Sequence, residues 1–195
     1  RVRDQFLDVT YRRENGDFGR FSTHRDLLGE VEGIFGEPSS TGIASSLDRL
    51  WDAFGDLAND PTGQAPRELV RQSGADLARR FQDSDRRIGE AQAGVVERMR
   101  ERVSEVNEIM RQIADLNTRI RSVSAGLREA PDVKDQRDQL IDRLSSVVGV
   151  RVLSRDDGTV GVAAGDALLV DAGQFTSFEI RDLGNGRYGV GVSGG

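Results

Sequence analysis

The 195-residue chain contains no cysteine, one histidine, one tryptophan and four prolines. Without cysteine, disulfide bonds, thiolate metal sites and cysteine nucleophiles are excluded, so packing must hold the fold. The single histidine, His24, rules out a histidine metal cluster and leaves one residue for any Ser-His-Asp site. We expect a surface or half-buried structural role for His24, because it falls in the first turn of an expected amphipathic helix. The sequence therefore offers no catalytic, cofactor-binding or metal-binding residues.

Long apolar runs and a surplus of positive charge are also missing. No run approaches the ~18 residues of a membrane span, and no basic-then-apolar signal peptide opens the chain. The formal net charge is -6 and the isoelectric point is about 5.0. Nucleic acids and anionic membranes bind clustered positive charge, so we expect neither of them as a partner.

The chain has instead a long helical pattern from Pro66 to Ser124. Apolar residues recur along it at helical spacing, and only three glycines interrupt it. From Val106 onward the apolar steps alternate between three and four, which lets one helix lie along another. Unbroken, this segment would be roughly 85 Å long at 1.5 Å per residue. Such a helix favours a fibre component, a coiled-coil signalling rod or an elongated adaptor over a small-molecule enzyme.

Three shorter helices are expected before the long one. They run from Arg1 to Glu14, from Ser22 or Thr23 to Phe35, and from Ile43 to Ala58. A polar turn at Asn15-Gly16 separates the first two, and Asn59-Asp60-Pro61 ends the third, because a residue before proline disfavours helix. Trp51 and Phe54 are expected to fill the core of the bundle, since aromatic residues at helical spacing usually pack.

A fifth helix is expected from Val133 to Val148, after a break that contains Pro131. Asp132 is a good N-cap for it, and Gly149 would close its end. This helix would form an antiparallel hairpin with the end of the long helix, where Leu116 and Ile120 lie. The apolar residues expected to face that end are Leu140, Ile141, Leu144 and Val147.

After Gly149 the apolar pattern changes from helical to alternating. Asp156-Asp157-Gly158-Thr159 predicts a tight hairpin between two valine-rich strands. Turns at Gly165-Asp166 and Gly184-Asn185-Gly186 separate three further strands, Ala167–Val170, Phe178–Arg181 and Tyr188–Val192. The expected fold class is therefore α+β: an elongated helical bundle with one very long helix over residues 1–148, then a small antiparallel β unit over residues 149–195.

Several patterns resemble functional motifs but have simpler explanations. The acids Glu97, Glu101, Glu105 and Glu108 alternate with arginines, which favours a solvated ion-pair face over a cation site. Gly189-Val190-Gly191-Val192 has no following helix, so it is not a phosphate loop. Asp156-Asp157-Gly158 lacks the downstream glutamate of a calcium loop. Asn117 lies beside the apolar stripe that begins at Val106, which we call the helical seam. It either fixes the register of two packed helices or is simply exposed.

Four segments follow one another in a distinctive order. They are Leu47-(x)3-Trp51-(x)2-Phe54 through Pro61, Arg67 through Leu77-Ala78-(x)2-Phe81, Val106-Asn107-Glu108-Ile109 leading to Gln112 through Ile120, and Asp135-Gln136-Arg137-Asp138-Gln139-Leu140 running into Val147-Val148-Gly149-Val150. Taken together in this order, they resemble the flagellar hook-associated protein 1 family, the hook–filament junction protein. The likeness extends from about residue 1 to 172.

The resemblance implies an interior N-terminal part of a structural flagellar subunit. Such a subunit is neither an enzyme nor a cofactor carrier, and it is exported through the flagellar type III apparatus to the extracellular flagellum. The implied partners are further copies in a junction ring, the hook protein, the second junction protein and an export chaperone that binds termini absent from these residues. We expect residues 1–195 alone to stay monomeric, because the terminal arms are missing and a buried seam would leave no large apolar patch.

The sequence is also compatible with other functions. The chain is also compatible with another flagellin-like junction or filament protein. A cytoplasmic coiled-coil adaptor or signalling rod would share the helical seam, although the hairpins after Gly149 count against it. An enzyme comes last, because no acid-base pair stands out in the β unit.

Overall fold

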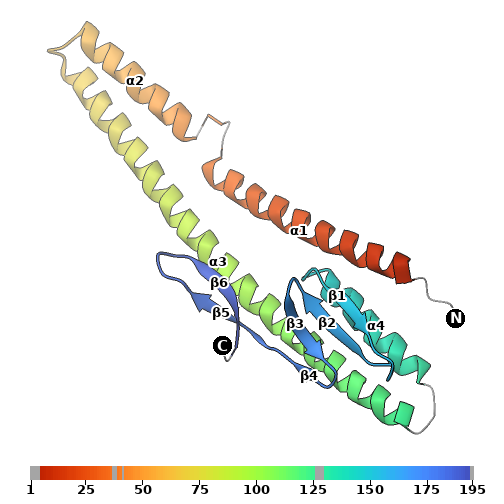
Figure 1. The fold of residues 1–195 in the computed structure, drawn as a ribbon. Helices are drawn as coiled ribbons and strands as arrows, with labels where there is room; N and C mark the ends of the chain where they lie inside the picture. Colours follow the sequence, from red (N-terminus) through yellow and green to blue (C-terminus); the bar gives the residue numbers. More distant parts are fainter. Residues whose placement is uncertain (1–4, 37–38, 41, 126–129, 194–195) are drawn as a thin grey trace. The chain divides into compact units, whose positions relative to one another are not determined.

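The structure is a computed structural model that describes residues 5–36, 39–40, 42–125 and 130–193. Helices come first and antiparallel strands follow (Figure 1). The helices are α1 (Gln5–Phe35), α2 (Ile43–Asn59), α3 (Gln64–Ala125) and α4 (Pro131–Ser145). This order of helices and antiparallel strands confirms the α+β class expected from the sequence.

The helices and strands pack into two compact units. Residues 1–23 and 96–195 form the first, and residues 24–95 form the second. The end of α3 therefore packs with the strands that follow it. The domain boundary expected after residue 148 separates the helical part of the sequence from the strands. It does not coincide with the division between these two packed units. As a boundary between independently folding domains, it stays a prediction.

Helix α3 is 62 residues long and carries Pro66 in its first turn. A proline there loses no hydrogen bond, because the first N–H groups of a helix have no partner within it. The alternating seam from Val106 onward is buried as expected: Ile113 and Ile120 have no exposed surface. The long helix and the end of α2 at Asn59 are both confirmed.

Helix α1 is continuous through Asn15-Gly16, so the expected turn and the expected helix start at Ser22 or Thr23 are wrong. The cause is a tertiary contact with the end of α4. A Cβ built on Gly19 would lie 2.3 Å from the carbonyl oxygen of Ser146, so only glycine allows this close approach. The glycines that suggested a turn in this segment instead allow α1 to approach the end of α4 closely.

Polar side chains of α1 complete the contact with α4. The guanidinium of Arg12, which is buried, donates to Asp142 at 2.8 Å. The side-chain amide of Asn15 donates to the carbonyl oxygen of Asp142 and to the hydroxyl of Ser145, both at 3.3 Å. These bonds satisfy polar groups that the contact takes out of water.

Helix α4 begins two residues earlier than expected and ends three residues earlier. Pro131 occupies the start, where its fixed φ suits the first turn. Asp132 therefore lies inside the first turn, and the expected N-cap is wrong. Because the helix ends at Ser145, Gly149 does not close it and Val147 lies on the surface.

The strands form two antiparallel sheets, where the sequence indicated one β unit. The first sheet has the order β1 (Arg151–Ser154), β2 (Val160–Ala164), β3 (Ala167–Asp171), β4 (Gln174–Phe175), and the second pairs β5 (Phe178–Asp182) with β6 (Tyr188–Val192). The predicted hairpin pairs Val152 with Val162 across Gly158, whose φ is +80°. Strand β4 was not expected; it returns through a tight turn in which Ala172 has a φ of +54°.

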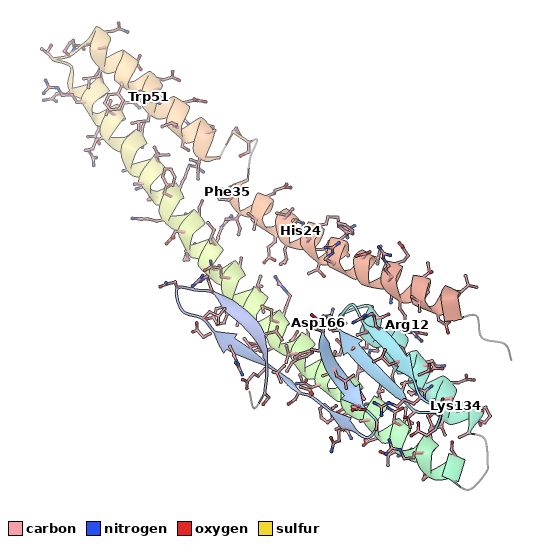
Figure 2. The ribbon with its side chains drawn as sticks, viewed as in Figure 1. Arg12, His24, Phe35, Trp51, Lys134 and Asp166 are labelled. Atoms are coloured by element: carbon pink, nitrogen blue, oxygen red, sulfur yellow. The ribbon has the colours of Figure 1, made fainter. Side chains whose placement is uncertain are left out.

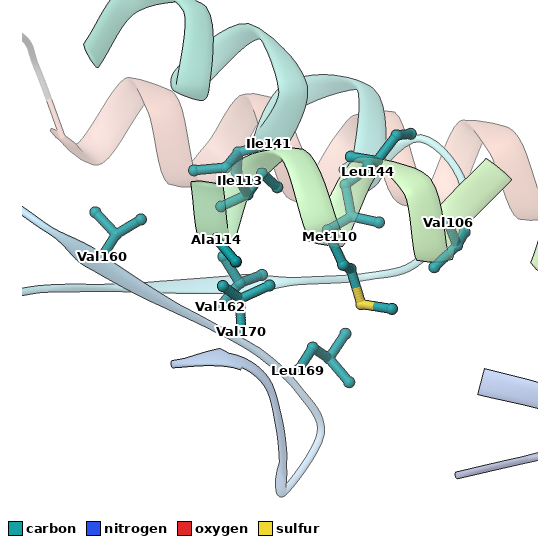
Figure 3. Packing of buried hydrophobic residues seen from close by; sticks show 11 residues of the cluster. Val106, Met110, Ile113, Ala114, Ile141, Leu144, Val160, Val162, Leu169 and Val170 are labelled. Atoms are coloured by element: carbon teal, nitrogen blue, oxygen red, sulfur yellow. The ribbon is translucent and has the colours of Figure 1, made fainter. Parts of the chain in front are cut away.

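The apolar core lies where the first sheet covers the end of α3 and α4 (Figure 3). Its members come from all three layers. They are Val106, Ile109, Met110, Ile113, Ala114, Ile141, Leu144, Val160, Val162, Leu169 and Val170. Leu116 and Ile120 are buried next to this core, and Leu140 packs partly against it. The expected helical hairpin between α3 and α4 is therefore present, with the sheet as a third layer.

Asn117 is fully buried under the first sheet. The alternative that this side chain is simply exposed is therefore wrong. Its Nδ2 donates to the carbonyl oxygens of Val160 and Ala172, each at 2.8 Å. One helix residue thereby holds the start of β2 and the turn between β3 and β4. The amide binds strands and does not set the register of two helices.

Candidate interaction surfaces

The described residues hold no group of three or more metal-ligating side chains. In the same part of the chain, no helix is both long enough and apolar enough to cross a membrane. His24 lies in the middle of α1 and is exposed, not in a first turn as expected.

Three of the four acids of the expected ion-pair face, Glu97, Glu105 and Glu108, form ion pairs with arginines. Glu97 pairs with Arg100 at 2.9 Å, and Glu108 pairs with Arg111 at 2.6 Å. The hydrogen bond from Arg111, with a second from Gln112, lowers the pKa of Glu108 to about 2. These pairs are exposed and each contributes little stability.

The other two motif-like patterns are also structural. Asp157 accepts hydrogen bonds from the hydroxyl of Thr159 at 2.6 Å and from its backbone N–H at 3.0 Å, which lowers the pKa of Asp157. Gly191 lies in β6, and a Cβ there would meet the guanidinium of Arg181 at 2.6 Å. Gly191 makes room for that arginine, which donates to the carbonyl oxygen of Val192 at 2.7 Å.

One side of α2 carries large apolar side chains that α3 does not cover. Trp51 is 64% exposed and Phe54 is 44% exposed, so the expectation that they fill the core is wrong (Figure 2). Their rings are neighbours, with centroids 6.0 Å apart. The residues of α2 that are buried are small, Ser46 and Ala53. The apolar side chains of α2 occupy a wide arc of the helix. Packing against the single helix α3 covers only part of that arc.

Leu47, Trp51 and Phe54 follow one another at helical spacing, and Asp48, Asp52 and Asp56 form a parallel column next to them. We call these six residues the acid-edged face. Elsewhere many acids pair with arginines three or four positions away, as Glu68 does with Arg71. Across the described ranges, none of the three aspartate carboxylates makes an ion pair or accepts a hydrogen bond.

A groove of about 620 Å³ lies between α3 and α4. Apolar side chains, Leu116 and Leu140, contribute to its wall, and arginines and glutamines provide most of the rest. We call it the arginine groove, and its members are Arg111, Gln112, Asp115, Leu116, Arg119, Gln136, Gln139, Leu140 and Arg143. Arg119 is exposed, and within the described part of the chain its guanidinium has no ion-pair partner.

Sequence reasoning missed both surfaces. The spacing of Leu47, Trp51 and Phe54 was visible but was assigned to the core, because apolar spacing does not tell how many neighbours a helix has. The unpaired aspartate column was a usable signal. The arginine groove needs the register of α4 on α3, which the sequence does not specify.

The described residues thus define a helical domain in which two small antiparallel sheets pack with the end of a long helix. Comparison with known proteins defines it further. The chain belongs to the family of the flagellar hook-associated protein FlgK helical domain, whose model matches residues 28–195.

Individual relatives agree with this family. Flagellar hook-associated protein 1 of Bacillus subtilis is 28% identical over 194 residues, covering 100% of this chain and 37% of the relative. The Salmonella typhimurium protein of the same name is 26% identical over 158 residues, covering 80% of this chain and 28% of the relative. The chain thus spans about a third of the length of these relatives.

A solved structure shows the same fold. The flagellar hook junction protein FlgK from Burkholderia pseudomallei superposes with a TM-score of 0.81 at 22% sequence identity. The match covers 96% of this chain and 34% of that protein. The arrangement of helices and strands described above is therefore shared by a protein of the flagellar hook junction.

Proposed function

We propose that this chain is part of a structural subunit at the hook–filament junction of the bacterial flagellum, where it acts by self-assembly with neighbouring subunits. The observation that carries the proposal is the family match over residues 28–195. The family match favours the junction protein over the other flagellin-like proteins and over a cytoplasmic adaptor rod.

The surfaces support a role in assembly. The acid-edged face presents an aromatic pair to solvent, and exposed apolar clusters of this kind mark interaction sites. The ion-pair face of α3 keeps the rest of the long helix soluble at little energetic cost. Neither feature needs bound cofactor or bond-making chemistry, and we propose that the chain has no enzymatic activity.

The proposed setting of the subunit is extracellular. It would be exported to the growing flagellum and would contact further copies of itself, the hook protein and the second junction protein. An export chaperone would bind the parent protein outside residues 1–195. Nucleic acid and membrane are not partners in this proposal, in keeping with the net charge of -6.

Deletion of the parent gene tests the proposal. A strain without the gene is expected to build hooks that carry no filament and to release filament protein into the medium. Reintroducing the gene should restore attached filaments and swimming. Filaments that remain attached in the deletion strain would contradict the proposed function.

A further inference from the structure

Two asparagines of this chain are followed directly by glycine, in the pairs Asn15-Gly16 and Asn185-Gly186. In such a pair the backbone nitrogen of the glycine can attack the side-chain amide carbon of the asparagine and close a five-membered ring. Glycine favours this reaction because it has no Cβ to hinder the approach of the two groups. The structure places the two pairs in opposite settings, so they can be compared within one molecule.

Asn185 and Gly186 lie at the exposed tip of the hairpin that joins β5 to β6 (Figure 1). Their φ angles are +54° and +70°, the left-handed values of a tight hairpin turn. The bond that closes the turn runs from the N–H of Arg187 to the carbonyl oxygen of Gly184, at 3.1 Å. In the described part of the chain, neither the side chain of Asn185 nor the N–H of Gly186 takes part in a hydrogen bond. Both reacting groups are therefore exposed to water and have no competing partner.

Asn15 and Gly16 are half-buried inside α1. The side-chain amide of Asn15 donates to the carbonyl oxygen of Asp142 and to the hydroxyl of Ser145. The N–H of Gly16 is engaged as well, because each N–H in a helix interior donates to the carbonyl oxygen four positions earlier. Ring closure at this pair must break these bonds and unwind part of the helix, and that cost adds to the barrier.

We propose that Asn185 is a site of spontaneous deamidation, and that the fold protects Asn15 from the same reaction. The N–H of Gly186 loses its proton to hydroxide, and the nitrogen forms a bond to Cγ of Asn185. The bond from Cγ to the side-chain nitrogen then breaks, and ammonia leaves with a proton taken from water. Nothing is oxidised or reduced, and water is the only co-reactant.

Water then opens the ring by adding across one of its two carbon–nitrogen bonds. Attack at Cγ of residue 185 produces aspartate and restores the original backbone. Attack at the backbone carbonyl carbon produces isoaspartate, in which the chain runs through Cβ and Cγ and is one atom longer. Both products add one negative charge to the tip of the hairpin, but only isoaspartate alters the path of the backbone.

The longer backbone of isoaspartate does not fit a turn that has only two central residues. The bond between Arg187 and Gly184 should therefore be lost, and the adjacent bond from the N–H of Leu183 to the carbonyl oxygen of Arg187, at 2.9 Å, should weaken. Strands β5 and β6 form a sheet of their own, and a two-stranded hairpin has little stability by itself. We infer that isoaspartate at position 185 loosens this hairpin and leaves the first sheet intact.

Incubation of the folded chain at mildly alkaline pH, followed by peptide mapping with mass spectrometry, tests the site. Asn185 should convert about tenfold faster than Asn15 or more, because only Asn15 must break its hydrogen bonds first. Conversion at Asn185 should accelerate as pH rises, since the attacking nitrogen must lose its proton. Equal rates at the two sites in the folded chain would overturn the proposal, and so would the absence of conversion at Asn185.

Unfolding the chain in guanidinium chloride separates the effect of the fold from that of the neighbouring residues. The two pairs should then react at rates that differ by no more than a few-fold, because neither has a structured environment. If Asn185 kept its full advantage over Asn15 in the unfolded chain, the sequence and not the fold would be the cause. That result would overturn the claim that α1 protects Asn15.

A conservative variant identifies the source of the ammonia that the folded chain releases. Asn185→Gln keeps the amide but requires a six-membered ring, so ammonia release should fall by about tenfold or more. Asn15→Gln is the matched control and should release ammonia as the unaltered chain does. Both variants should retain the circular dichroism of the chain. Undiminished release from Asn185→Gln would show that another residue reacts and would overturn the assignment.

Amide exchange of the isoaspartate form, isolated by chromatography, tests the effect on the hairpin. Exchange at Leu183 and Arg187 should become faster, while β2 stays protected. Freshly prepared Asn185→Asp is the matched control, because it carries the added charge on a normal backbone, and its hairpin should exchange as in the unaltered chain. Unchanged exchange in the isoaspartate form would overturn the inferred loosening. Equal acceleration in Asn185→Asp would assign the effect to charge and contradict the backbone explanation.

Discussion

The side-chain amide of Asn117 forms two hydrogen bonds with the backbone of Val160: Nδ2 donates to its carbonyl oxygen at 2.8 Å, and Oδ1 accepts from its N–H at 3.1 Å. A neighbouring strand would offer the same pair of groups. Asn107 binds Phe178 in the same way, with both distances at 2.8 Å. Two asparagines on one face of α3 thus act as strand-like partners for the two sheets.

Replacing Asn117 with alanine should destabilise the chain by about 2–4 kcal/mol, because buried backbone groups of Val160 and Ala172 lose their partners. Urea unfolding followed by circular dichroism measures the loss. Asn107→Ala is the matched control: it should speed amide exchange in β5 and β6 while leaving β2 protected. A loss below about 1 kcal/mol for Asn117→Ala would show that water replaces the amide.

Gly19→Ala should destabilise the chain by about 1–3 kcal/mol although alanine favours helix, because its Cβ would press on the carbonyl oxygen of Ser146. Gly29→Ala lies in the same helix with nothing within 4 Å, and it should stabilise by about 0.5–1 kcal/mol. Thermal unfolding of the two variants compares these effects. Stabilisation by both would mean that α1 does not rest on the end of α4.

Ile113→Ala should cost about 2–5 kcal/mol, because this side chain has no exposed surface and its loss leaves a cavity in the core. Trp51→Ala removes a larger side chain that is 64% exposed, and it should change stability by only about 0.5 kcal/mol. The measurement is chemical denaturation at low protein concentration, where self-association does not contribute. Greater destabilisation by Trp51→Ala would place Trp51 in the core after all.

The pKa of Glu108 provides a test by pH. Its folded value of about 2 lies below the ordinary 4.5, so its stabilising effect is present above pH 4.5 and is lost as pH falls towards 2. Because the carboxylate is exposed, solvent screens the effect on stability. Arg111→Gln should raise the pKa of Glu108 towards its ordinary value, as carbon-13 NMR of the carboxyl group would show. An unchanged pKa would exclude Arg111 as the cause.

Elements with strong local signals could be predicted from the sequence. The seam of α3 follows from apolar spacing, and the hairpin at Asp157-Gly158 follows from turn chemistry. The continuity of α1 could not be predicted, because Asn15-Gly16 looks like a turn until α4 is placed against Gly16 and Gly19. Strand β4 has only two residues, and the turn before it is held by Asn117, a residue more than fifty positions away.

The interaction surfaces show where sequence reasoning ends. Apolar periodicity identified the ridge of Trp51 and Phe54 but not its exposure, because exposure depends on how many helices pack around α2. The arginine groove depends on which residues of α4 face Leu116, which is a matter of tertiary register. Family resemblance, in contrast, was recoverable from the ordered segments alone and agrees with the match over residues 28–195.

The most direct test of the account is the position of this chain on intact flagella. Antibodies raised against residues 1–195 and labelled with gold should bind, in electron micrographs of isolated flagella, at the short boundary between hook and filament. The deletion strain provides the control for specificity and should show no label. Label along the filament, along the hook, or only inside the cell would contradict a structural role at the junction.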